Sequence, residues 1–227
     1  MTLALSSCCS DGVAIIEDTR IYKPFAMEKD RILYSEKLRG VILNVIFGYS
    51  GIVGMYDLFV RYVLGDLVIL RDDPDRYTTE NMILKFCGIM DKFRELYTPF
   101  DLQIIVGRQF PKRTASDLYL IKSSGDHEPI PQWNLIGERT IAEPLVNALY
   151  YEDKIYTMRD FAELSYCIIK YIEKREPYGT VGTGGNKPSI RYLKHFGEID
   201  VQPSDAEFQE FERAYDKYEV KFNGILI

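Results

Sequence analysis

A glycine-rich segment, YGTVGTGGNKPS, is the first part of the sequence whose residues could do chemistry. Backbone N–H groups in such segments can hold phosphate, so a small intracellular phosphate-binding enzyme is one hypothesis. The segment lacks the GxxxxGK[ST] order of a P-loop, and Pro188 directly after Lys187 prevents a helix from starting where a P-loop needs one. The pattern therefore favours a flexible surface loop that contains Gly179, Gly182, Gly184 and Gly185.

The two histidines, His127 and His195, are the next candidates for catalysis. A hydrolase of the triad type needs a Ser or Cys nucleophile and an orienting acid close to its histidine. The sequence contains no GxSxG segment and no Cys–His signature. We therefore predict no catalytic residue and a protein that is not an enzyme.

The candidate for a metal site is the carboxylate run Asp72, Asp73 and Asp75. The run lacks the alternating ligands and central glycine of a calcium loop, and Arg71 and Arg76 can neutralise it. No CxxC pair or Cys–His cluster offers zinc ligands. The sequence predicts neither a metal site nor a cofactor.

The cysteines divide into two groups. Cys87 and Cys167 lie on apolar helical faces and are predicted to be buried free thiols. Cys8 and Cys9 lie in a small, polar segment that resembles a mobile arm. Adjacent cysteines rarely bond to each other, so these thiols either stay idle or bond to another chain in an oxidising medium.

Composition limits the partners of the chain. Its 227 residues carry a net charge of −6, which argues against nucleic acid and membrane surfaces, because both attract a positive field. No run of ~18 apolar residues could cross a bilayer, and residues 1–12 lack the basic region of a signal peptide. The 17 Tyr suit the buried centre of a protein interface, although they could also be spread over core and surface.

The elements that must position these residues alternate between strands and helices, which predicts an α+β fold. Apolar, β-branched runs predict strands at residues 39–47, 66–72, 101–110, 116–124, 133–141 and 189–201. Apolar residues at helical spacing predict helices at residues 55–65 and 79–97, and from Thr157 and Ser204 onward. The prolines of residues 125–132 predict a loop.

From residue 38 to residue 203 the chain resembles the polyhedrin and granulin family of baculovirus occlusion bodies. GVILNVIF, FVRYVLGDLVILRD and DLQIIVGRQFPKRTASDLYLIKSS are similar to the family's early strands, its helix and its Tyr-bearing strand. IPQWNLIGERTIAEP, YTMRDFAELSYCIIKYIEKREPYG and HFGEIDVQPSDAEF resemble its later elements. The family's basic run for nuclear entry has no counterpart, so a distant nudivirus occlusion-body protein fits better.

The resemblance implies a β-sandwich-like core with several amphipathic helices and extended N- and C-terminal arms. It divides the chain into an N-terminal arm (residues 1–36), a core domain (residues 37–203) and a C-terminal helix and tail (residues 204–227). The implied function is structural: homotrimers would build a crystal lattice around virions. That lattice would form inside the infected cell, in the nucleus, and later protect virions outside the host.

Release in the alkaline insect gut would follow from tyrosine ionisation near pH ~10, because a chain at −6 would then repel itself. The candidate pH-sensitive interface residues are Tyr22, Tyr34, Tyr150, Tyr151, Tyr178, Tyr192 and Tyr218. Under this hypothesis Cys8 and Cys9 would form intermolecular disulfides that staple the lattice. A viral matrix or assembly protein that forms no crystals is the alternative.

Overall fold

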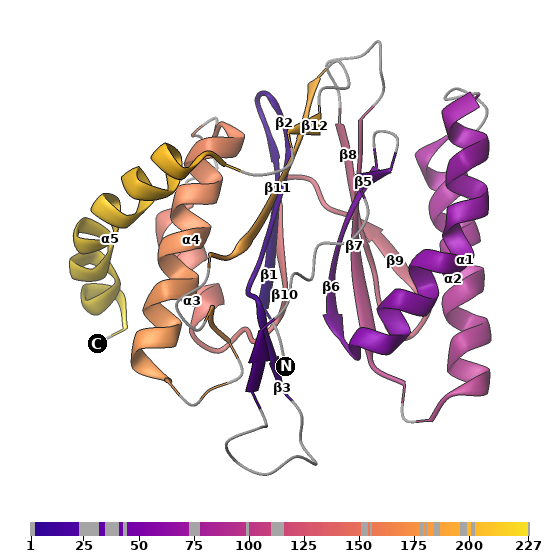
Figure 1. Ribbon diagram of the computed structural model, residues 1–227, viewed down its shortest axis with the longest axis horizontal. Helices are drawn as coiled ribbons and strands as arrows, with labels where there is room; N and C mark the ends of the chain where they lie inside the picture. The colour runs from indigo at the N-terminus through magenta and orange to yellow at the C-terminus, as the bar shows by residue number, and fades with distance from the viewer. Residues whose placement is uncertain are drawn as a thin grey trace.

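Two antiparallel five-stranded sheets face each other, and helices cover the outer face of each sheet, in a computed structural model (Figure 1). This arrangement confirms the predicted α+β class with a sandwich-like core. The structure describes residues 3–22, 32–34, 41–42, 45–72, 78–98, 100–109, 116–150, 154, 156–177, 179, 181–183, 187–195, 199–200 and 203–226.

The first sheet has the strand order β10-β1-β2-β11-β12. Its strands are β1 (Leu3–Cys9), β2 (Gly12–Glu17), β10 (Trp133–Gly137), β11 (Ser189–Lys194) and β12 (Ile199–Asp200). Strands β1 and β2 form a hairpin in which Cys9 lies opposite Gly12. The segment expected to be an N-terminal arm therefore contains two inner strands of a sheet.

The second sheet has the strand order β5-β6-β7-β8-β9. Its strands are β5 (Val41–Ile42), β6 (Val45–Gly51), β7 (Leu102–Gln109), β8 (Ser116–Ile121) and β9 (His127–Pro129). A separate two-stranded sheet pairs β3 (Arg20–Tyr22) with β4 (Ile32–Tyr34). Strand β9 lies inside the stretch that its prolines predicted to be a loop.

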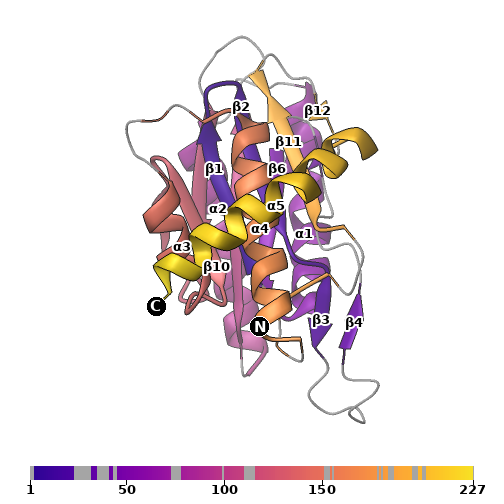
Figure 2. The same cartoon turned by 90° about the vertical axis from the view of Figure 1, so that its left-hand side faces the viewer.

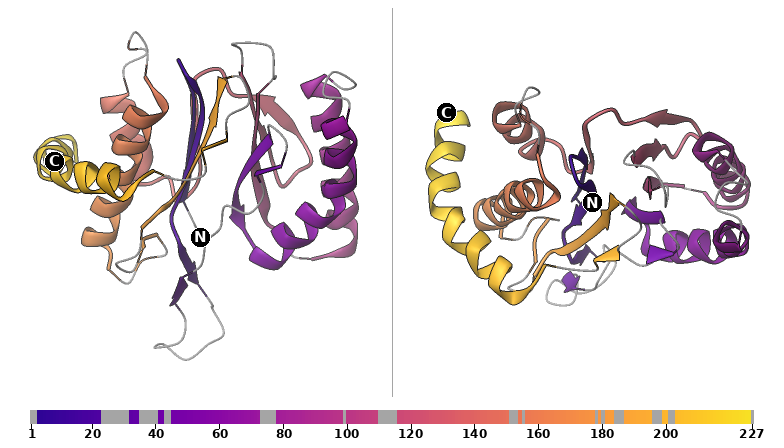
Figure 3. Two further views of the ribbon diagram at one scale, coloured as in Figure 1. Left: turned by 45° about the horizontal axis from the view of Figure 1, so that its top comes forward. Right: turned by 90° about the horizontal axis from the view of Figure 1, so that it is seen from above.

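The helices lie in two groups on opposite sides of the paired sheets (Figure 3). On one side are α1 (Val53–Asp72) and α2 (Thr79–Leu96); on the other are α3 (Ala142–Leu149), α4 (Met158–Arg175) and α5 (Asp205–Ile225). Helix α5 crosses the outer face of α4, so the first sheet is covered by two layers of helix (Figure 2). Within the described residues, no helix is long and apolar enough to span a bilayer.

Two helix predictions are confirmed, and one strand prediction is wrong. Thr157 with Asp160, and Ser204 with Glu207, form the reciprocal capping boxes that begin α4 and α5. Residues 66–72, predicted to be a strand, form the last part of α1. A short apolar run fits a buried helix as well as a buried strand, and here it continues the helix that begins at Val53.

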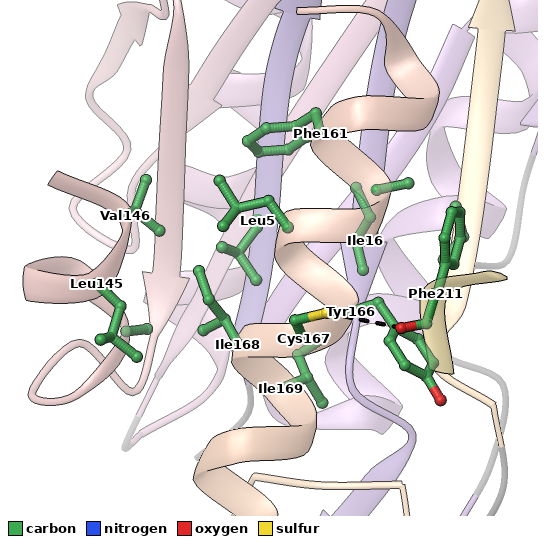
Figure 4. Packing of buried hydrophobic residues seen from close by; sticks show 14 of the residues in the cluster. Leu5, Ile16, Leu145, Val146, Phe161, Tyr166, Cys167, Ile168, Ile169 and Phe211 are labelled. Carbon is green, nitrogen blue, oxygen red and sulfur yellow. Dashed lines mark hydrogen bonds between the residues drawn. The ribbon is translucent and has the colours of Figure 1, made fainter. Parts of the chain in front are cut away.

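Successive side chains of a strand point to opposite faces of the sheet. Because both faces of the first sheet are covered, β1 and β2 are buried on both sides. Leu5 and Ile16 pack towards α4, as Figure 4 shows. Ala4 and Ile15 point the other way and belong to the cluster that holds the two sheets together. The members of that cluster are Ala4, Val13, Ile15, Ile46, Ile105, Leu118, Leu120, Ile130, Ile136 and Leu193.

Helix α5 is attached to α4 by an apolar row with a polar border. The buried residues of the row are Phe208, Phe211, Tyr215 and Phe222. The Cys167 thiol donates a hydrogen bond to the backbone carbonyl of Phe211 over 3.8 Å, drawn as a dashed line in Figure 4. At the border, the Tyr166 hydroxyl and the Lys170 ammonium both donate to the carboxylate of Glu212.

Because Tyr166 takes part in this contact between α4 and α5, we expect the protein to lose stability at alkaline pH. Burial and the hydrogen bond to Glu212 raise the pKa of Tyr166 above its ordinary value of 10.0. Because the unfolded chain ionises Tyr166 first, this stabilisation is complete below pH ~10 and is lost as the pH rises further. Thermal unfolding between pH 8 and 11.5 should show this loss, and Tyr166→Phe should show less of it. An equal alkaline loss in both proteins would contradict the assignment.

Candidate functional site

A cluster of buried polar groups lies where β1 begins and β2 ends. Asp18 directly follows β2, and its side chain is fully buried. Residues Val181, Gly182 and Thr183, which follow α4 in the chain, lie against it and are also buried. Burial of a carboxylate is costly unless hydrogen bonds compensate for it, so the partners of Asp18 define the site.

Two backbone N–H groups donate to the Asp18 carboxylate. The donors are the N–H of Leu3, 3.3 Å from Oδ1, and the N–H of Gly182, 3.1 Å from Oδ2. The backbone N–H of Asp18 itself donates to the carbonyl oxygen of Leu3 over 3.1 Å. Asp18 thus ties the beginning of β1 to the segment after α4, although these segments are far apart in sequence.

Two threonines extend the cluster. The backbone N–H of Thr19 donates to the carbonyl of Gly182 over 3.2 Å, and its hydroxyl donates to the carbonyl of Thr183 over 3.4 Å. The Thr183 hydroxyl donates to Glu173 on α4 over 2.9 Å. The segment that approaches Asp18 is therefore fixed from both sides, by β2 and by α4.

Glu17, the last residue of β2, points towards the other sheet. Its side chain is fully buried, and its carboxylate accepts a hydrogen bond from the backbone N–H of Tyr49 on β6. A Cβ on Gly48 would lie 2.6 Å from the Ile15 side chain and 3.0 Å from the Glu17 carboxylate. The absence of a side chain at Gly48 therefore leaves room for this contact between the sheets.

Thr2 is the hydroxyl-bearing residue next to this cluster in the sequence. It precedes Leu3, whose N–H is bound to Asp18, although Thr2 itself lies outside the described residues. A threonine with a free α-amino group carries a nucleophile and a general base within one residue. Neither Thr2 nor Asp18 is among the site residues predicted from the sequence. The signal that could have indicated β1 and β2 is the Asp11–Gly12 pair between two stretches of small and apolar residues, a pattern typical of a hairpin.

The glycine-rich segment takes part in this cluster, but its N–H groups are directed to protein acceptors. The N–H of Gly182 donates to Asp18, and the N–H of Gly179 donates to the carbonyl of Glu176 over 2.8 Å. Neither group is therefore free to hold phosphate. The other two glycines of the predicted flexible loop, Gly184 and Gly185, lie outside the described residues.

The histidines lie away from Asp18. His127 is on β9, where its Nδ1 is 3.7 Å from the Cys87 thiol of α2. The backbone N–H of His195 donates to the carbonyl of Asp11, at the turn between β1 and β2. This turn is at the opposite end of β2 from Asp18. The structure thus brings neither histidine into the cluster.

Cys8 and Cys9 are half-buried free thiols at the end of β1. Burial raises the pKa of Cys8 to about 11 and that of Cys9 to about 12. The thiolate is the reactive form, so both groups are poor nucleophiles at neutral pH. An intermolecular disulfide stays a prediction, and these raised pKa values disfavour it.

The tyrosines proposed as pH-sensitive interface residues have different environments. Tyr150 and Tyr192 are buried inside this chain, and Tyr218 packs at the edge of the same core. Burial raises the pKa of Tyr150 and of Tyr218 above the ordinary value. Tyr22 ends β3 and Tyr34 ends β4, whereas Tyr151 and Tyr178 lie outside the described residues. The role of all seven tyrosines at an interface stays a prediction.

Among the described residues, no group of three or more His, Cys, Asp or Glu side chains is placed to hold a metal ion. The finding covers the residue ranges given above, and it includes Asp18 and its neighbours. Asp18 belongs to no such group, and its carboxylate accepts hydrogen bonds from the N–H groups of Leu3 and Gly182.

Comparison with known proteins gives matches among solved structures. No protein-family model matches the chain, and no curated protein matches it. A Gly-1 mutant of Anbu from Hyphomicrobium sp. strain MC1 has a TM-score of 0.74 at 14% identity, over 97% of this chain and 96% of that chain. Anbu from the same strain also matches in a second structure, with a TM-score of 0.72 at 15% identity, over 96% and 95% of the two chains.

This likeness overturns the resemblance to polyhedrin and granulin. The expected occlusion-body function, the lattice of trimers, the virion partners and the location in a viral occlusion body are all wrong. The resemblance rested on the order of apolar strands and amphipathic helices, which unrelated α+β proteins share. Over nearly its whole length, this chain has the fold of Anbu.

Proposed function

We propose that the chain hydrolyses amide bonds, with the hydroxyl of Thr2 as the nucleophile. The observation that carries the proposal is the buried Asp18 carboxylate, which binds the N–H of Leu3, the residue next to Thr2. The likeness of the fold to that of Anbu, over nearly the whole chain, supports it. This proposal replaces the expectation that the chain is not an enzyme.

The chemistry requires cleavage of the bond between Met1 and Thr2, which frees the α-amino group of Thr2. That amine would remove the proton of the Thr2 hydroxyl while the oxygen attacks the carbonyl carbon of the substrate. The protonated amine would then give its proton to the leaving amine as the C–N bond breaks. Water, activated by the same amine, would hydrolyse the resulting ester and release the free Thr2 hydroxyl.

Asp18 would act by position and by charge. A carboxylate near the α-amino group favours the ammonium form that develops when the hydroxyl is deprotonated. Its hydrogen bond to Leu3 also limits the directions in which residue 2 can leave the sheet. The bond from Gly182 and the Thr183–Glu173 contact support Asp18 from the opposite side.

The proposal is tested by labelling with a peptide epoxyketone, an electrophile that reacts with a hydroxyl and an adjacent amine together. Intact mass should show loss of Met1 and addition of one probe molecule, and peptide mapping should place the probe on Thr2. Thr2→Ser should be labelled, whereas Thr2→Ala should lose labelling and at least about 1,000-fold of its peptide hydrolysis.

The matched control is Thr140→Ala, which changes an exposed threonine near α3 and should leave both signals unchanged. Retention of Met1, labelling at another residue, or full hydrolysis by Thr2→Ala would each overturn the proposed function.

A further inference from the structure

A hollow of about 390 Å³ lies beside α5, away from Asp18. It is lined by residues of α5 between Glu210 and Lys221 and by Glu163 of α4. Figure 2 shows that α5 lies outermost here, crossing α4. The hollow is therefore separate from the site proposed for hydrolysis.

Three cations line the hollow in a regular row. Arg213, Lys217 and Lys221 follow one another at a spacing of four residues, so they project from one side of the helix. All three are exposed, and none has an ion-pair partner among the described residues. This row is notable on a chain whose net charge is −6.

The acidic residues of the hollow do not cancel this row. Glu210 is already paired with Arg159 of α4. Glu163 is half-buried, and its burial raises the pKa of its carboxyl above the ordinary value. The other charged groups near Glu163 are the cations Arg159, Lys154 and Lys217 and the carboxylate of Asp160. The mouth of the hollow therefore has an excess of positive charge.

An aromatic ring adds an apolar surface between the cations. Tyr218 lines the hollow and is partly buried, and its ring packs against Phe222 with 5.7 Å between centroids. The ammonium of Lys221 lies 5.5 Å from the centre of the same ring. A ligand in the hollow would therefore meet positive charge at its edge and a flat apolar surface at its base.

We propose that this hollow binds an extended acidic peptide whose carboxylates occupy alternate positions. Four residues of helix rise about 6 Å, so successive cations of the row are about 6 Å apart along α5. In an extended peptide, alternate side chains lie on one face about 6.6 Å apart. Three alternate carboxylates therefore match Arg213, Lys217 and Lys221 one to one, whereas a compact polyanion reaches only part of the row.

The test measures fluorescence anisotropy of a labelled Glu-Ser-Glu-Ser-Glu-Ser peptide in the Thr2→Ala background, where the proposed hydrolysis cannot consume the probe. At low salt we expect this peptide to bind at least ~5-fold more tightly than the isomer Glu-Glu-Glu-Ser-Ser-Ser. Lys217→Ala with Lys221→Ala should weaken binding by about 10-fold, since an exposed charge pair contributes a factor of ~2–5. Binding should also weaken in 0.5 M salt.

The matched control replaces Arg61 and Lys92, two exposed cations of α1 and α2 on the other side of the molecule, by alanine. This pair should change the affinity by less than ~2-fold. Equal binding of the two isomers, tighter binding of inorganic triphosphate, or an equal loss in the control pair would overturn the proposal. Because the assay uses Thr2→Ala, its outcome does not depend on hydrolysis by Thr2.

Discussion

Asp18→Asn is expected to lower the free energy of unfolding by about 2 kcal/mol and to slow hydrolysis at Thr2 by at least about 100-fold. The asparagine side chain has a single acceptor oxygen, so the N–H of Leu3 or of Gly182 would lose its partner. A buried donor without an acceptor costs about 1–3 kcal/mol. The rate falls because the negative charge that stabilises the Thr2 ammonium is lost.

Urea unfolding and peptide hydrolysis would measure the two effects of Asp18→Asn separately. Asp11→Asn is the matched control, because Asp11 also accepts a backbone N–H bond, from Met158 over 2.8 Å, but at the other end of β2. We expect Asp11→Asn to leave the hydrolysis rate within ~2-fold of the unmodified chain. Full activity of Asp18→Asn would show that the carboxylate has no part in the reaction.

Phe161→Ala should give the largest loss of stability among single changes in α4, about 3–5 kcal/mol. The Phe161 side chain is fully buried and points from α4 towards the first sheet (Figure 4). Its ring meets that of Tyr150 edge to face, with 6.0 Å between centroids. Its removal would leave a cavity that the packed sheet and α3 cannot close.

Urea or thermal unfolding would measure this loss. Phe161→Leu, which keeps most of the volume, should cost less than half as much. Leu96→Ala is a second control, since Leu96 is 72% exposed and its truncation should change stability by under ~0.5 kcal/mol. A loss below ~1 kcal/mol for Phe161→Ala would contradict the packing described here.

The helices that begin with a strong cap could be predicted from sequence. Thr157 and Ser204 sit three residues before an acid and ahead of apolar residues at helical spacing, and both signals are local. The last part of α1 could not be predicted in this way, because its apolar run has no period that separates helix from strand.

Strands β1 and β2 escaped prediction for a different reason. Ser6, Ser7, Cys8 and Cys9 make β1 resemble a polar arm. In the structure, the Ser7 hydroxyl donates to the carbonyl of Gln132 over 3.0 Å, and Ser6 donates to that of Asn134 over 3.4 Å. These partners are more than 120 residues away, so no local pattern indicates them.

The candidate site could not be predicted for the same reason. The contacts of Asp18 with Leu3 and Gly182 define the candidate site, and Gly182 is 164 residues away from Asp18 in the sequence. The resemblance to viral proteins was no substitute, because it compared the order of elements and not the contacts between them.

The strand order of the first sheet also determines when its centre can form during synthesis. Strand β2 pairs with β11, and β1 pairs with β10, so the hairpin at the start of the chain waits for partners made near its end. Strands β6, β7 and β8 are closer in sequence and can pair sooner. Because pairing over a long separation is slow, the hairpin of β1 and β2 lacks its neighbouring strands until β10 and β11 are available. Pairing of β2 with β11 then brings Gly182 to Asp18. The Asp18 carboxylate is therefore fully hydrogen-bonded only after the first sheet has formed.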